Sequence, residues 1–152
     1  NNMPSNKETL LQQHIANFLT EHHKYIRKNR GVTDRDFHLI EEHILQFVKH
    51  TQADTYQSLV NNFGTDADSE IIKAIKEEVI KTPLWLLIRN GVPVRGTRIE
   101  LYKPKPRSNT SPIQEENFKK NIFSYKTEYR YNSGTKERID LVIWLNGFPI
   151  KL

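Results

Sequence analysis

The last fifteen residues of the chain, RIDLVIWLNGFPIKL, constrain its fold more than any other stretch. Residues 141–145 are apolar at every position, which is typical of a strand buried on both faces of a sheet. Asn146-Gly147 follows, and this pair is the strongest short-range signal for a hairpin turn because both residues tolerate a positive φ. The sequence therefore predicts a hairpin in which residues 148–152 return beside the first strand.

Asp140 stands at the start of this apolar strand. A carboxylate there is costly to bury unless a cation meets it. The cation is either a neighbouring base, Arg138 or Lys136, or a ligand with a chemical role, and the residues leave both interpretations open. A two-residue turn places position 153 opposite Asp140, and a three-residue loop places position 154 there. A metal site on this hairpin therefore needs ligands that the sequence does not contain.

Helical signals fill roughly the first 90 residues and strand signals fill the rest, which predicts an α+β fold. We expect a mainly helical part over 1–90 and a β-rich part over 91–152. A capping box of Ser5 and Glu8 opens the first expected helix. The expected helices run from Ser5 to about Glu21, from about Asp34 through Val48, over 55–62 up to Gly64, and from a cap at Asp68 or Ser69 to Pro83.

The β-rich part begins with residues 97–102, which alternate as a strand does. The preceding apolar run, 84–88, is too short to classify, and residues 113–120 predict one or two helical turns. Alternation resumes at residue 122 and places four aromatic side chains on one strand face: Phe123, Tyr125, Tyr129 and Tyr131. Such a face can stack on bases, but the same residues are typical of a half-buried sheet face, which is the interpretation we favour.

The net charge is +5 and the isoelectric point is near 9.4, which permits binding to nucleic acid. The candidate phosphate contacts are Lys103, Lys105 and Arg107 in a proline-rich loop, and Lys126 and Arg130 on the polar strand face. The alternative is that these cationic side chains are simply exposed to water and bind no phosphate. The chain has no cysteine, which excludes disulfides and thiolate metal sites, and no apolar run long enough to span a membrane. Its six histidines lack zinc-site spacing.

Three stretches, LIRNGVPVRGTRIELYKPKP, ENFKKN and RIDLVIWLNGFPI, together resemble the N-terminal region of the R (restriction) subunit of type I restriction enzymes. An earlier stretch, FVKHTQADTYQSL, resembles the Phe-x-x-x-Thr-Gln segment of the same subunits more loosely. The chain departs from the pattern at Phe118, where Tyr is usual, and at Thr127-Glu128, where Arg-Gln is common. The matching residues are Gly91-Val92, Lys103-Pro104, Asn121, Ile139 to Val142, Asn146, Gly147 and Pro149.

The resemblance implies a nuclease core of the Asp…Glu-x-Lys type, with a mixed sheet flanked by helices and truncated before its last strand is complete. Asp140 matches the first carboxylate, which in such cores is catalytic and binds Mg²⁺. The Glu-x-Lys pair would fall at about positions 154 and 156, and Lys151 precedes that acid, so it is not the catalytic lysine. Glu8 is a weaker candidate metal ligand, because its capping role already explains it.

For the whole subunit the resemblance implies ATP- and Mg²⁺-dependent cleavage of double-stranded DNA, with ATP bound by motor domains further along the chain. Its implied partners are DNA and the methylation and specificity subunits, in the cytoplasm of a bacterium or archaeon, with no membrane. We expect this fragment alone to be inactive. The alternatives are a non-catalytic DNA-binding or subunit-docking module that uses the helical first 90 residues, and a protein-interaction domain with incidental positive charge.

Overall fold

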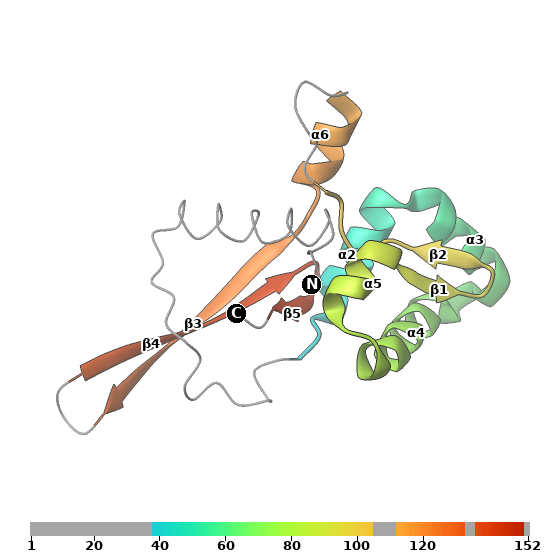
Figure 1. Cartoon of the computed structure of the whole chain (residues 1–152). Helices are drawn as coiled ribbons and strands as arrows, with labels where there is room; N and C mark the ends of the chain where they lie inside the picture. The colour runs from blue at the N-terminus through green and yellow to red at the C-terminus, as the bar shows by residue number, and fades with distance from the viewer. Residues whose placement is uncertain (1–37, 105–111, 133–135, 151–152) are drawn as a thin grey trace, which may run out of the picture.

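The computed structural model of the chain describes residues 38–104, 112–132 and 136–150, and between 127 and 141 it describes the backbone alone (Figure 1). Glu8 and the first expected helix lie outside the described residues, as do Lys105 and Arg107. In the described part, helices come first and a three-stranded sheet comes last, with a short hairpin between them. This arrangement of helix and sheet confirms the α+β class.

Helix α2 spans Glu41–Thr51, so the expected start at about Asp34 is wrong. The chain just before it is extended, with Ile40 at φ −97° and ψ 92°, because the Ile40 amide donates a hydrogen bond to the Gly147 carbonyl at 2.8 Å. Acidic residues fill the first turn and basic residues the last, which complements the helix dipole. The sequence predicts an apolar stripe of Phe37, Ile40, Ile44, Phe47 and Val48 for this helix. The last three are buried in α2, whereas Ile40 lies before the helix and Phe37 lies outside the described residues.

Helix α3 spans Ala53–Phe63 and ends at Gly64, whose φ of +58° is the conformation that a glycine adopts readily. A single 3₁₀ turn, η2 (Gly64–Asp66), leads into α4, which spans Ala67–Lys81. The expected cap at Asp68 or Ser69 is wrong. Asp66 holds the cap position without a side-chain cap bond, and the Ser69 hydroxyl donates to the Asp66 carbonyl at 2.9 Å instead.

Pro83 ends α4 as expected, since Thr82 is extended and Pro83 itself becomes the first residue before a new helix. That helix, α5 (Leu84–Asn90), is the apolar run that the sequence leaves unclassified. It leads into an antiparallel hairpin of β1 (Val92–Val94) and β2 (Thr97–Ile99). Strand β2 is therefore shorter than the expected 97–102.

A glutamine side chain explains why β2 stops at residue 99. Gln52, between α2 and α3, donates from Nε2 to the Glu100 carbonyl at 2.9 Å and accepts from the Glu100 amide at 2.7 Å. Its amide group thus pairs with both backbone groups of Glu100, as a neighbouring strand would do. The preceding residue, Thr51, donates its hydroxyl to the Phe47 carbonyl at 2.7 Å and completes the end of α2.

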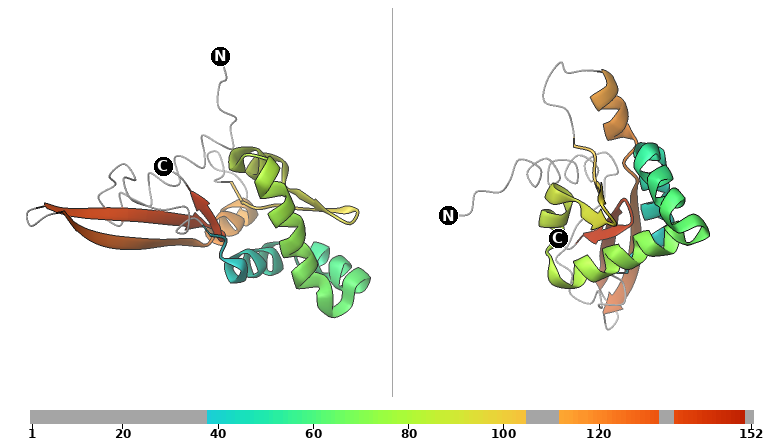
Figure 2. Two further views of the ribbon diagram at one scale, coloured as in Figure 1. Left: turned by 90° about the horizontal axis from the view of Figure 1, so that it is seen from below. Right: turned by 90° about the vertical axis from the view of Figure 1, so that its right-hand side faces the viewer.

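Helix α6 (Pro112–Lys119) leads into the second sheet, where β3 (Phe123–Asn132), β4 (Lys136–Leu145) and β5 (Phe148–Ile150) lie in the order β3-β4-β5. All described pairings in both sheets are antiparallel, so the expected mixed sheet is not found in the described residues. Figures 1 and 2 show that the long β3–β4 pair extends away from the helices, while β5 lies near them.

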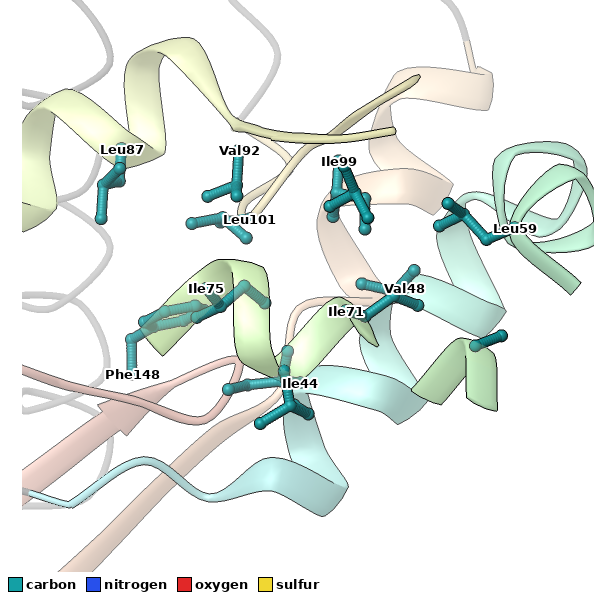
Figure 3. Close-up of a cluster of buried hydrophobic side chains, with 13 residues drawn as sticks. Ile44, Val48, Leu59, Ile71, Ile75, Leu87, Val92, Ile99, Leu101 and Phe148 are labelled. Carbon is teal, nitrogen blue, oxygen red and sulfur yellow. The ribbon is translucent and has the colours of Figure 1, made fainter. Parts of the chain in front are cut away.

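The main core joins the helical half to the β-rich half (Figure 3). Helices α2, α3 and α4 contribute one side of it, and the β1–β2 hairpin lies across them with Val92 and Ile99 pointing inward. Phe148 of β5 belongs to the same cluster, which links the second sheet to the helices. Each fully buried aliphatic or aromatic side chain here contributes about 1.5–3 kcal/mol to stability.

The expected aromatic strand face is only partly a core. Phe123 is half-buried and packs against a second cluster, which contains Ile143 and Leu145 of β4 and Ile88 of α5. Tyr125, two residues further along β3, is 39% exposed. The core interpretation therefore holds for Phe123 and is wrong for Tyr125. The side chains of Tyr129 and Tyr131 lie outside the described part of the chain.

Candidate functional site

The β4–β5 hairpin has the two-residue turn that the sequence predicts. Asn146 and Gly147 form it with φ of +50° and +85°. The paired residues are Ile143 with Ile150, Trp144 with Pro149 and Leu145 with Phe148. Asp140 lies three residues before Ile143 on β4, so the residue that would stand opposite it lies three residues beyond Ile150. The register therefore assigns position 153, and the three-residue alternative is wrong.

Asp140 lies in the middle of β4, because this strand begins at Lys136. The expectation that Asp140 opens the strand is therefore wrong. The reason is the long partner strand, since β3 pairs with every residue of β4 and Asp140 stands opposite Glu128. Sequence reasoning missed the position of Glu128, which depends on the register between two strands and not on local spacing.

Asn146 has no exposed surface, and its amide connects three separate segments of the chain. Its Oδ1 accepts a hydrogen bond from the Ile122 amide at 2.6 Å. Its Nδ2 donates to the Leu101 carbonyl at 2.9 Å and to Oδ1 of Asn121 at 3.1 Å. The Asn146 backbone amide also donates to the Ile122 carbonyl at 2.7 Å. A buried polar group needs such partners, and here both donors of the side chain are used.

Asn121 extends this network to the segment that follows β2. Its Oδ1 accepts from the Lys103 amide at 3.0 Å, and its Nδ2 donates to the Lys103 carbonyl at 2.7 Å. The same Nδ2 also donates to the Phe118 carbonyl at 2.8 Å, which holds the end of α6. Asn121 and Asn146 therefore fix the chain directly before β3 to the turn directly after β4.

The N-terminal end of α2 is seated on the same turn. The Ile40 amide bonds to the Gly147 carbonyl, and Ile44 packs so closely that a Cβ on Gly147 would lie 2.7 Å from its Cγ1. Next to it, the Trp144 indole donates to the His38 carbonyl at 2.8 Å, with the two rings 5.5 Å apart. The segment from His38 to Ile44 thus contacts both the turn and the end of β4.

The candidate DNA contacts are spread over different elements. The Lys103 ammonium pairs with Glu100, and the Lys103 side chain is only 18% exposed. Lys126 is exposed on β3, and Arg130 lies four residues further along the same strand. Their role toward phosphates stays a prediction.

Among the described side chains, no group of three or more histidine, aspartate or glutamate residues comes together in a way that could hold a metal ion. No helix in the described part of the chain is long and apolar enough to cross a membrane.

Comparison with protein families gives one decisive match. A family model described as the type I restriction enzyme R protein N terminus matches residues 6–152. The chain belongs to this family. Neither the curated proteins nor the solved structures contain a significant match to it.

Several residues that carry the family resemblance take part in the hydrogen-bond network around the hairpin turn. The residues that carry the resemblance in the sequence, among them Asn121, Asn146 and Gly147, meet around the hairpin turn. Lys103 contributes its backbone to the same network, and Gln52 fixes the neighbouring residue Glu100. These residues make a scaffold that positions β4. These positions of the family pattern therefore have a structural role in this chain.

A separate cluster joins α2, α3 and α4, the three longest helices in the described part of the chain. Asp68 of α4 accepts from the Tyr56 hydroxyl of α3 at 2.6 Å and from the Lys49 ammonium of α2 at 3.0 Å. Burial opposes ionisation of Asp68, but the two hydrogen bonds and the charge of Lys49 outweigh it and lower the pKa of this carboxyl. The hydrogen bond to Asp68 raises the pKa of both Lys49 and Tyr56.

Replacing Asp68 by asparagine is expected to destabilise the chain by about 1 kcal/mol at pH 7, because the ion pair is partly exposed and screened. The Asp68 pKa is lowered on folding, so its contribution is present above the unfolded value of 3.8 and is lost as the pH falls through the lower folded value. Urea unfolding of both proteins from pH 7 to pH 2 measures this. The exposed Glu77→Gln on the same helix is the control, and a difference that does not shrink below pH 4 would contradict the assignment.

Proposed function

We propose that this chain carries the first metal-binding carboxylate of a DNA-cleaving site in a type I restriction R subunit, with Asp140 as that carboxylate. In the whole subunit the site would cleave double-stranded DNA in a Mg²⁺- and ATP-dependent reaction, together with methylation and specificity subunits. ATP would be bound by parts of the subunit further along. Lys103, Lys126 and Arg130 would contact phosphates, which position DNA without reading its sequence.

The observation that supports this proposal is the register of the β4–β5 hairpin. If β5 continued in this register, its next residues would lie beside Asp140, with position 153 opposite. The Glu-x-Lys pair is expected to start at about position 154, so a chain that continues past Leu152 would bring its acid within one residue of Asp140. The pairing of β4 with β5 thus provides the closeness that a two-carboxylate site needs.

The register also restricts which residue can share a metal ion with Asp140. Directly opposite residues in an antiparallel pair lie on the same face, and the next residue along lies on the other. An acid at position 153 would meet Asp140 without any irregularity. An acid at position 154 would do so only if the continued β5 contained a β-bulge, a feature that is frequent next to active sites.

The donor chemistry of Asp140 suits a hard divalent cation. Mg²⁺ prefers carboxylate oxygens in an octahedral arrangement and keeps several of its waters, so one carboxylate holds it weakly. When bound, Mg²⁺ would stabilise charge on the phosphate and help to activate water. The protein would supply Asp140, the acid on the continued β5 and a lysine to orient the water.

Comparing the 152-residue chain with a longer chain from the same gene tests this proposal directly. Supercoiled plasmid with Mg²⁺ is expected to stay intact with the 152-residue chain, because its hairpin lacks the second acid. A chain extended by about 20 residues along its gene is expected to bind Mg²⁺ and to nick the plasmid. Nicking by the shorter chain that disappears in its Asp140→Ala variant would show that the downstream acid is not required.

A non-catalytic module that binds DNA or docks subunits is the alternative, and the net charge of +5 supports it. Such a module would bind DNA with an affinity that falls steeply as salt rises, since bound cations are released from the phosphates. Its affinity would not change on replacing Asp140. The extended chain distinguishes the two functions, because only the nuclease cuts. Absence of DNA binding at low salt would favour a protein-interaction domain.

A further inference from the structure

Asn146 is more elaborately held than a hairpin turn requires. Among residues whose exposure the structure describes, it is the one polar side chain that is fully buried. A two-residue turn needs only a residue that accepts a positive φ, and an asparagine there usually faces water. Asn146 instead pays for burial with three side-chain hydrogen bonds, to Ile122, Leu101 and Asn121. All three partners lie outside the hairpin.

The bond to Ile122 connects Asn146 to the strand on one side of β4, and the chain itself connects Asn146 to the strand on the other side. The turn itself begins β5, and Ile122 directly precedes β3, whose first residue Phe123 pairs with Leu145. The pairing of β4 with β3 and the pairing of β4 with β5 therefore both begin next to the buried side chain of Asn146. Asp140 lies six residues away along β4, at roughly 20 Å for a rise of about 3.3 Å per residue, and has a partner position on each side.

A metal site at Asp140 would require a fixed register between β4 and its neighbouring strands. A slip of one residue moves a partner by about 3.3 Å and turns its side chain to the other face of the sheet. Mg²⁺ requires its oxygen ligands at about 2.0–2.1 Å in near-ideal geometry. The described β5 pairs with β4 over three residues, so the ladder itself does little to prevent such a slip.

We propose that Asn146 is a positioning residue for the site at Asp140. Its amide fixes the register of β4 against β5 and the placement of the hairpin against the segments at Leu101 and Ile122. The inference rests on the proposed function for its consequence at the metal. The fixing of the register itself can be measured without metal.

Asn146→Gly is the decisive variant, because glycine keeps the turn conformation while all three side-chain bonds disappear. In the 152-residue chain, NMR contacts between paired residues such as Ile143 and Ile150 report the register, and hydrogen exchange reports the Ile122 amide. Asn146→Gly is expected to weaken or multiply the cross-strand contacts and to reduce Ile122 protection at least tenfold. Leu59→Ala is the matched control, because it opens the core at α3 and leaves the hairpin bonds intact. It is expected to retain both signals.

In the extended chain, the same pair of variants is titrated with Mn²⁺ as the probe and assayed for nicking with Mg²⁺. Asn146→Gly is expected to bind the metal at least tenfold more weakly per folded molecule and to lose kcat, whereas Leu59→Ala keeps the affinity of the parent. Unchanged contacts and affinity in Asn146→Gly would overturn the proposal, since turn conformation alone would then set the register.

Two further outcomes are also informative. If Asn146→Gly does not fold, Asn121→Ala replaces it. That variant removes one bond to Asn146, together with the bonds of Asn121 to Lys103 and Phe118, and leaves the turn residues unchanged. Smaller losses in the same direction support the proposal, and no loss overturns it. If the parent extended chain binds no metal, the proposed function fails, and with it the consequence at Asp140. The NMR result on the shorter chain still decides whether Asn146 fixes the register.

Discussion

Gly147→Ala is expected to lower the free energy of unfolding by about 4 kcal/mol, a large share of what a domain of this size has. Gly147 adopts a φ of +85°, which costs an L-residue about 1–2 kcal/mol. The new methyl would also clash with the Ile40 carbonyl oxygen and lie 2.7 Å from Cγ1 of Ile44. Helix α2 would have to move off the turn, and this would cost the remainder. Urea unfolding followed by circular dichroism measures the effect.

Gly96→Ala is the matched control for this variant. Gly96 has nearly the same backbone conformation, with φ of +75° in the β1–β2 turn, but a Cβ there meets nothing within 4 Å. It is expected to cost about 1 kcal/mol, from the backbone conformation alone. The difference between the two variants isolates the contact between α2 and the hairpin. Equal losses would show that α2 does not pack on Gly147 as described.

The features that sequence reasoning predicted correctly depend on local chemistry. The two-residue turn follows from the conformational freedom of Asn146-Gly147, the end of α3 from Gly64, and the break after α4 from Pro83. In each case one or two residues restrict the backbone whatever surrounds them. The apolar stripe of α2 was also predicted, because period 3.6 is a property of the element itself.

The features that were missed depend on contacts between distant segments. Helix α2 starts late because Ile40 bonds to a turn more than 100 residues further along. Strand β2 stops early because the side chain of Gln52 takes the place of a strand partner. Asp140 lies inside its strand because β3 is long enough to pair beyond it. No local pattern contains this information, since each partner is chosen by the tertiary fold.

The candidate site also has one feature that local sequence predicts and others that depend on distant contacts. The place of Asp140 on the hairpin could be predicted, because Asn146-Gly147 indicates a two-residue turn and the observed pairing matches such a turn. Half-buried Asn121 and buried Asn146 could be recognised in the sequence only as matching positions of a family pattern. The side chains of the two residues are hydrogen-bonded to each other. Replacing either one is therefore expected to leave a polar group of the other without its partner, which destabilises the fold.

Asp140→Asn in the extended chain is expected to reduce Mg²⁺-dependent nicking by about 10³-fold or more. Asparagine keeps the size of the side chain and removes its charge, so a metal ligand is weakened without a change in shape. The loss should appear in kcat with DNA binding retained, because a metal held by Asp140 would stabilise charge that develops in the transition state. Plasmid nicking at saturating DNA, with Mg²⁺ varied, measures the effect.

Asp54→Asn is the matched control, since it makes the same chemical change on the exposed first turn of α3, away from the hairpin. It is expected to nick as the parent does. Mg²⁺ raised to high concentration should restore part of the activity of Asp140→Asn if the defect is weak metal binding. Parental nicking by Asp140→Asn would remove Asp140 from the site. In that case Glu128, which stands opposite position 140 on β3, would be the next carboxylate to replace.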